Sequence, residues 1–114
     1  MKKRILLTGA SGTVGREVLK QLLDLKDRFD VSVFDLKTPK SIRLFSSFGN
    51  GFHVFYGDIS DPNGTIEAVR NQDAVIHLAA LIPPAADVNK PLAEKINVYG
   101  TLHLVNNLEK FSPN

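Results

Sequence analysis

The chain has 114 residues, 43% hydrophobic content and a formal net charge of +2, which together exclude a disordered chain and a strongly basic nucleic-acid-binding protein. It contains no cysteine, which excludes disulfide bonds and thiolate chemistry. No apolar segment is long enough to span a membrane and no signal peptide precedes the first predicted strand, so we expect one cytoplasmic domain.

The first predicted elements are a strand at residues 5–7, a glycine-rich turn and a helix. The turn contains Gly9, Gly12 and Gly15, in a spacing typical of phosphate binding before a helix N-terminus. Gly9 permits the sharp turn, Gly12 lets the backbone approach a pyrophosphate, and Gly15 allows the helix to pack closely on the sheet. The helical period is read from the apolar residues Val14, Val18, Leu22 and Leu25. A purely structural glycine turn is the alternative.

A second strand is predicted at residues 31–34, and Asp35 closes it. In a dinucleotide-binding fold, an acidic residue twenty positions after Gly15 accepts hydrogen bonds from the adenosine ribose. Its charge also repels a 2′-phosphate, so the sequence favours NAD over NADP. Lys37 weakens this preference because its side chain can reach toward a phosphate. The alternative is that Asp35 only starts a turn before Pro39.

The next segment, residues 41–48, is predicted to be either a short helix or an irregular crossover. Residues 52–56 form the third predicted strand, after the turn at residues 49–51. Asp58 follows this strand at its carboxyl end, where open α/β sheets bind ligands, so we expect it near the adenine. A loop aspartate that caps nearby N–H groups is the other interpretation.

Asp61 and Pro62 predict the start of a helix through Arg70, with Ile66 and Val69 facing inward. Residues 73–80 then form a fourth strand, apolar in the manner of a parallel strand covered on both faces. The small side chains at its carboxyl end, Ala79 and Ala80, leave room for a dinucleotide to lie close to the backbone.

After a loop at residues 81–89, a long helix is predicted at residues 91–110. Asn97 places a polar group near its apolar side, and Gly100 indicates close packing because glycine lowers helix propensity. The apolar positions of this helix are Val98, Leu102, Val105 and Leu108.

Four motifs carry a family resemblance: TGASGTVG at residues 8–15, GDISD at 57–61, HLAA at 77–80 and INVYGT at 96–101. In this order they resemble the N-terminal part of an extended short-chain dehydrogenase/reductase of the NAD-dependent epimerase/dehydratase family. The resemblance implies that Asn97 supports the active-site geometry and that NAD is the cofactor. It also implies a set of cofactor-binding residues: Gly9, Ser11, Gly12, Thr13, Val14, Gly15, Asp35, Leu36, Asp58, Ile59, Leu78, Ala79 and Ala80.

We therefore expect an α/β fold, a Rossmann-like doubly wound parallel sheet of about four strands in the order 3-2-1-4 with helices on both faces. Residues 1–114 are expected to be the N-terminal part of the NAD(P)-binding domain, without the substrate-binding part. Truncation after the fourth strand would leave that strand at an edge, so we expect a homo-oligomer that pairs through it or through the last helix.

The family's reaction begins with hydride transfer to or from a carbon of the substrate, often a nucleotide sugar, while a tyrosine assisted by a lysine moves the proton. This chain contains no Tyr-x-x-x-Lys: His103 follows Tyr99 at that spacing, and Ser60 follows Tyr56. The three histidines have no metal-ligand spacing. Two hypotheses follow, the cofactor half of an epimerase, dehydratase or reductase, or a stand-alone dinucleotide-binding or regulatory module without catalysis.

Overall fold

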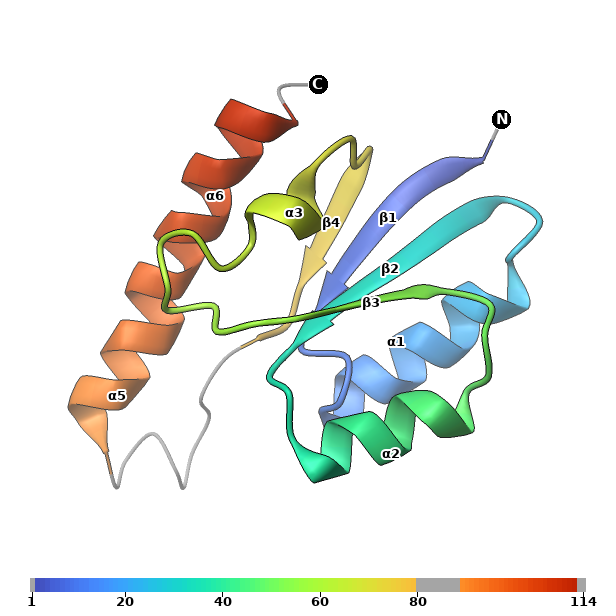
Figure 1. Ribbon diagram of the computed structural model, residues 1–114, viewed down its shortest axis with the longest axis horizontal. Helices are drawn as coiled ribbons and strands as arrows, with labels where there is room; N and C mark the ends of the chain where they lie inside the picture. The colour runs from blue at the N-terminus through green and yellow to red at the C-terminus, as the bar shows by residue number, and fades with distance from the viewer. Residues whose placement is uncertain (1, 80–88, 113–114) are drawn as a thin grey trace.

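The computed structural model describes residues 2–79 and 89–112, and its strands form one parallel sheet (Figure 1). The strand order is β3-β2-β1-β4, which confirms the predicted topology. The described strands are β1 (Lys3–Thr8), β2 (Phe29–Asp35), β3 (His53–Tyr56) and β4 (Ala74–His77). The helical segments are α1 (Thr13–Asp24), α2 (Pro39–Ser47), α3 (Ile66–Val69), α5 (Lys90–Glu94), the π-helical turn η1 (Lys95–Tyr99) and α6 (Gly100–Phe111).

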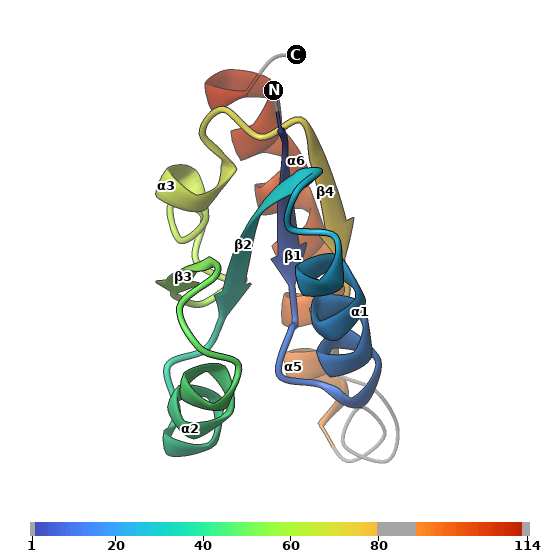
Figure 2. The ribbon, with the colours of Figure 1, turned by 90° about the vertical axis from the view of Figure 1, so that its right-hand side faces the viewer.

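Alternating side chains of β1 and β2 divide the core between the two faces of the sheet. On one face, Leu7 and Val33 pack with Leu19 of α1 and Phe45 of α2. On the other face, Leu6 and Phe34 pack with residues of α3 and α6, namely Ala68, Val69 and Leu104. Figure 2 shows α1 in front of the sheet and α6 behind it. Helices therefore cover both faces, as the doubly wound fold requires.

Helix α1 buries only part of its predicted apolar face: Leu22 is buried and Val18 is half-buried, but the other two predicted positions are exposed. Its buried residues are Gly15, Leu19 and Leu22, whereas Val14 is 64% exposed and Leu25 is 42% exposed. The reason is the close approach at Gly15, where a Cβ would collide with the carbonyl oxygen of Gly9. That contact turns the face of Gly15 toward the sheet, and a period of 3.6 residues then places positions 19 and 22 on the same side.

The segment after β2 is a helix, which decides between the two interpretations of residues 41–48. Thr38 is the N-cap of α2, and its hydroxyl accepts a hydrogen bond from the Ser41 N–H at 3.0 Å. The Ser41 hydroxyl accepts in return from the Thr38 N–H at 3.0 Å, which completes a capping box. Pro39 occupies the first helical position, where the missing N–H has no cost.

The predicted helix from Pro62 to Arg70 is wrong in its first half, because α3 contains only Ile66–Val69. Asp61 is not an N-cap of α3. Its carboxylate accepts from the Asn63 N–H at 3.0 Å and its carbonyl from the Gly64 N–H at 2.9 Å, so residues 61–64 form a turn. Val69 is fully buried and Ile66 is half-buried, so the inward-facing positions of the prediction hold.

The predicted helix at residues 91–110 is present as one continuous rod of α5, η1 and α6 (Figure 1). Its predicted apolar stripe is largely exposed, since Val98 is 50%, Leu102 is 51% and Val105 is 43% exposed. The buried positions of α6 are instead Gly100, Leu104 and Asn107. None of the described helices has the length and apolar character needed to cross a membrane.

Candidate functional site

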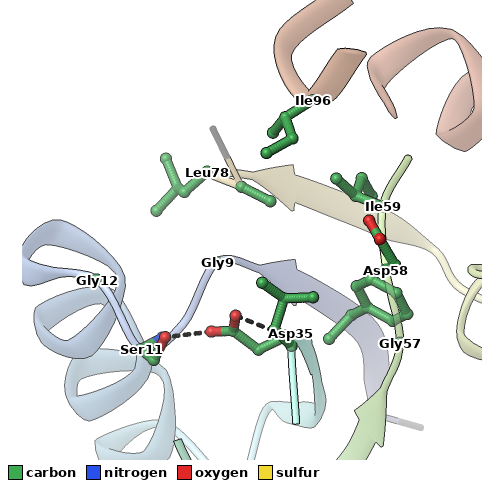
Figure 3. Close-up of a pocket in the computed structure, with 12 residues that line it drawn as sticks. Gly9, Ser11, Gly12, Asp35, Gly57, Asp58, Ile59, Leu78 and Ile96 are labelled. Carbon is green, nitrogen blue, oxygen red and sulfur yellow. Dashed lines mark hydrogen bonds between the residues drawn. The ribbon is translucent and has the colours of Figure 1, made fainter. Parts of the chain in front are cut away.

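The carboxyl ends of the strands converge on a pocket of about 240 Å³, shown in Figure 3. It lies between the turn after β1, the ends of β2 and β4, the segment after β3 and the helical turn η1. Most of its surface is apolar, with two carboxylates at the side of β2 and β3. Its lining consists of Gly9, Ser11, Gly12, Phe34, Asp35, Leu36, Gly57, Asp58, Ile59, Leu78, Ala79 and Ile96.

The turn between β1 and α1 requires glycine at position 9 and leaves the start of α1 open at position 12. Gly9 has a φ of +73°, and a Cβ there would lie 2.7 Å from the backbone nitrogen of Ala79. Gly12 is the exposed N-cap of α1, and no side chain caps the helix there. The N-terminal N–H groups of this twelve-residue helix are therefore available to an anion, together with the positive end of the helix dipole.

Asp35 ties the end of β2 to this turn. Its Oδ2 accepts from the Ser11 N–H at 2.8 Å, and its Oδ1 accepts from the Leu36 N–H at 2.8 Å (Figure 3). An ionised carboxylate has about four lone-pair sites, so acceptor capacity remains for a ligand in the pocket. The half-buried carboxylate is thus fixed in place before any ligand arrives.

Asp58 supplies the second carboxylate, at the start of the segment after β3. Its Oδ1 accepts from the Ser60 hydroxyl at 2.7 Å and from the Ser60 N–H at 2.9 Å. These two bonds, and then the charge of Lys95, hold the pKa of Asp58 below its ordinary value against the opposing effect of burial. Next to it, the buried Ile59 supports the apolar wall of the pocket below Gly100 of α6.

A hydrogen-bonded histidine ends β4, next to Leu78 of the pocket lining. His77 Nδ1 is 2.6 Å from the Thr8 hydroxyl oxygen, and His77 Nε2 is 3.0 Å from the Thr101 hydroxyl oxygen. Burial lowers the pKa of the half-buried His77 imidazole. In the sequence, His77 stands out only as the first residue of the HLAA motif, which predicts no contact for its side chain.

The pocket brings together nine of the predicted cofactor-binding residues and adds Phe34, Gly57 and Ile96. Gly57 belongs to the GDISD motif and Ile96 to INVYGT, so both motifs already pointed to this place. The nine are Gly9, Ser11, Gly12, Asp35, Leu36, Asp58, Ile59, Leu78 and Ala79.

The other predicted site residues lie outside the pocket lining, and the roles of all the predicted site residues stay predictions. Thr13 and Val14 are exposed on the first turn of α1, and Gly15 is buried against the glycine turn. Asn97 is exposed on η1, where its backbone carbonyl accepts from the Thr101 hydroxyl at 2.8 Å. Ala80 lies outside the described residues. Within residues 2–79 and 89–112, no group of three or more His, Cys, Asp or Glu side chains is placed to hold a metal ion.

The strand order, the glycine turn before α1 and the acidic residue at the end of β2 define a dinucleotide-binding fold of the Rossmann type. Residues 6–112 match the sequence profile of the 3-beta hydroxysteroid dehydrogenase/isomerase family. The chain belongs to this family, among the extended short-chain dehydrogenases/reductases that include the NAD-dependent epimerases and dehydratases.

Several of the relatives in sequence and in structure are larger enzymes. The chain is 34% identical to sanguinarine reductase of Eschscholzia californica over 84% of this chain and 34% of the relative. It is 30% identical to UDP-N-acetylglucosamine 4,6-dehydratase (inverting) of Campylobacter jejuni, over 90% of this chain and 31% of the relative. The structure of UDP-glucose 4-epimerase of Thermus thermophilus, solved in complex with NAD, superposes with a TM-score of 0.77 at 25% identity. The match covers 95% of this chain and 34% of the epimerase. The chain thus spans about a third of the length of these proteins.

Proposed function

We propose that this chain is the NAD(H)-binding portion of a nicotinamide-dependent epimerase, dehydratase or reductase. The observation that carries the proposal is the position of Asp35, whose carboxylate lines the pocket while it holds the glycine turn through the Ser11 N–H. One residue thereby connects the part of the site suited to ribose hydroxyls with the part suited to phosphate.

The residues present fit a dinucleotide. A pocket of about 240 Å³ is smaller than the roughly 300–1,000 Å³ of sites that enclose a whole drug-sized ligand, so it suits the adenosine end of the cofactor. Asp35 would accept from the ribose hydroxyls, and Asp58 and Ile59 would flank the adenine. Gly12 and the N-terminus of α1 would hold the pyrophosphate, because an exposed, uncapped helix start favours an anion.

The arrangement of charge supports NAD over NADP. The Asp35 carboxylate lies beside the predicted ribose position, and a 2′-phosphate there would be repelled by it. Lys37 is exposed two positions further, in the connection between β2 and α2. We expect the fixed carboxylate to outweigh this mobile cation, since screening by solvent and salt weakens an exposed charge.

Bound NAD would supply a hydride acceptor, and its reduced form a hydride donor. The relatives that act on nucleotide sugars support a nucleotide sugar or a related carbonyl or hydroxyl compound as the substrate. Within this chain, Asn97 on η1 is proposed to support the active-site geometry. We expect the 114-residue polypeptide by itself to show no turnover, because it contains no Tyr-x-x-x-Lys to transfer the proton.

Calorimetric titration of the purified chain with NADH and with NADPH tests the proposal. We expect saturable binding that is tighter for NADH. Asp35→Asn should weaken NADH binding by about 1 to 3 kcal/mol, the scale for leaving buried hydrogen-bonding groups unpaired. The matched control is Asp30→Asn, on the same strand and outside the pocket lining, which should bind as the wild type does. Tighter binding of NADPH, or an Asp35→Asn variant with unchanged affinity, would contradict the assignment.

A further inference from the structure

Thr8, His77 and Thr101 form a hydrogen-bonded chain across β1, β4 and α6 that the proposed cofactor contacts do not include. Thr8 and His77 are neighbours in the parallel register of β1 and β4. The imidazole lies between two hydroxyl oxygens, at 2.6 Å from that of Thr8 and 3.0 Å from that of Thr101. The ring therefore connects the carboxyl ends of two neighbouring strands to the helix behind the sheet.

The Thr101 end of this chain determines which ring nitrogen carries hydrogen. The Thr101 hydroxyl donates to the Asn97 carbonyl at 2.8 Å, and a carbonyl oxygen can only accept. Because a hydroxyl has one hydrogen, Thr101 has none left to donate to His77 Nε2. The hydroxyl oxygen must accept from that nitrogen, so His77 Nε2 carries the hydrogen.

The Thr8 end leads to the same assignment independently. The Thr8 hydroxyl oxygen accepts from the Ala79 N–H at 3.2 Å and from the Leu78 N–H at 3.1 Å, which it shares with the Thr8 backbone carbonyl at 3.1 Å. These two donors occupy both of its lone pairs. Its own hydrogen is then free to be donated to His77 Nδ1, which must be unprotonated. A hydrogen on Nδ1 would direct three donors at one hydroxyl oxygen and leave the Thr8 hydrogen without its acceptor.

We infer that His77, as the neutral Nε2–H tautomer, is a positioning residue that sets where the Leu78–Ala79 backbone borders the cofactor pocket. This inference rests on the proposed function. Leu78 and Ala79 line the pocket, and Gly9 packs so closely on them that a Cβ would lie 2.7 Å from the Ala79 nitrogen. The Thr8 hydroxyl accepts from both of their N–H groups, sharing that of Leu78 with the Thr8 backbone carbonyl, and the ring orients that hydroxyl.

The surroundings of the ring favour the neutral form. The groups bonded to it are the hydroxyls of Thr8 on β1 and Thr101 on α6, and among the described residues it is in no ion pair. Burial adds to this preference by lowering the pKa of His77. Because no carboxylate of the described residues is bonded to the ring to stabilise an imidazolium, protonation removes an acceptor from Thr8 without a compensating contact there.

Long-range ¹H–¹⁵N correlation spectra of the histidine rings test the network without any cofactor. In the full 114-residue chain at neutral pH, we expect the His77 signals, identified by their loss in His77→Phe, to show the neutral Nε2–H tautomer. A neutral Nδ1–H tautomer or a positively charged ring would overturn the inference.

Calorimetric titration with NADH tests the effect on the pocket. Thr101→Val and His77→Phe should bind NADH about tenfold more weakly, a change that converts to about 1.4 kcal/mol, and Thr101→Ser should restore wild-type affinity. The control Ser112→Ala removes both hydrogen bonds between Ser112 and Gln72 at the far end of α6 and should leave the affinity unchanged.

The possible outcomes separate the two proposals. Wild-type affinity in Thr101→Val, or an equal loss in Ser112→Ala, would show that the network does not position the pocket and would overturn the inference. Failure of the wild-type chain to bind NADH would contradict the proposed function and the role of His77 in it, while the ring spectra would still decide the tautomer.

Discussion

Asp35 combines a structural bond with a predicted ligand contact in one carboxylate. The Ser11 and Leu36 N–H groups each engage one of its oxygens, so the side chain has little freedom left to lose when a ligand binds. Interactions that are already in place before binding reduce the entropy cost of forming the complex. Asp35 is therefore the residue on which cofactor affinity and cofactor choice should depend most.

His77 should make the stability of the chain depend on pH. Burial lowers the pKa of His77 below its ordinary value of 6.5, so between these two pKa values the unfolded chain binds more protons than the folded chain. The contribution of the neutral ring is fully present above pH 6.5 and is lost as the pH falls toward the folded-state pKa. Urea unfolding at several values between about pH 5 and pH 8 measures this dependence.

The informative comparison is between the wild type and His77→Phe. We expect the free energy of unfolding of the wild type to fall more steeply with acidification than that of the variant, since the variant has no imidazole at this position. Parallel pH profiles in the two proteins would show that His77 does not titrate in this way.

At the residue scale, sequence spacing predicted Asp35 and the glycines because these residues follow one another in a fixed local order. The histidine network was not predictable in that way. Thr8 and His77 are separated by 69 positions and His77 and Thr101 by 24, so their contact depends on strand pairing and helix placement. The only sign of this network in the sequence was a polar residue, His77, within an apolar strand. That pattern does not identify a hydrogen-bond partner.

The turn between β1 and α1 is the element in which glycines have separable roles. A Cβ at Gly12 would meet only the Gly9 carbonyl oxygen, at an ordinary 3.5 Å, whereas a Cβ at Gly15 would collide with that same oxygen. Gly12→Ala should therefore fold as the wild type does but bind NADH more weakly, because the methyl group would occupy the approach to the pyrophosphate. Gly15→Ala should lower the free energy of unfolding by about 1 to 3 kcal/mol, the usual cost of overpacking.

Urea unfolding together with NADH titration of both variants checks this division. Gly51→Ala is a suitable control, since a Cβ there would meet nothing within 4 Å. Normal NADH affinity in Gly12→Ala, or normal stability in Gly15→Ala, would show that the roles have been assigned incorrectly.

The elements themselves were largely predictable, but the buried faces of α1 and α6 were predicted only in part. For the last helix, hydropathy favoured Val98 on η1 and Leu102 and Val105 on α6, yet α6 buries Asn107. The Asn107 side-chain amide donates to the Pro62 carbonyl and to the Thr65 hydroxyl, each at 2.9 Å. Both N–H groups of the amide therefore keep a hydrogen-bond partner when the side chain is buried. Such long-range hydrogen bonds reverse the preference that hydropathy alone would give.

At the scale of the whole molecule, β4 is an edge strand of the described sheet. Its open side presents unpaired backbone groups beside half-buried Val75 and Ile76, and α6 leaves Leu102 and Val105 about half exposed. Edge strands and apolar patches of this kind favour association. We therefore predict that the 114-residue polypeptide self-associates through the β4 edge or through α6.

Light scattering over a concentration series, with hydrogen exchange of residues 74–77, measures this association. Ala74→Lys should shift the chain toward monomer, because lysine on an edge strand opposes pairing and Ala74 is exposed. The control Ser46→Lys, which adds the same charge at an exposed position of α2, should leave the association unchanged. A wild-type monomer at all concentrations with freely exchanging amides in β4 would contradict the prediction.

The central claim is that a dinucleotide binds across the carboxyl ends of the strands, and backbone amide shifts on titration with NADH test it most directly. We predict saturable changes that are largest at the residues that border the pocket, namely Gly9, Ser11, Gly12, Asp35, Leu36 and residues 57–59. The amides of Asn63, Asn106 and Lys110, outside that pocket, should change little. An absence of saturable changes, or changes centred on those last three residues, would contradict the account.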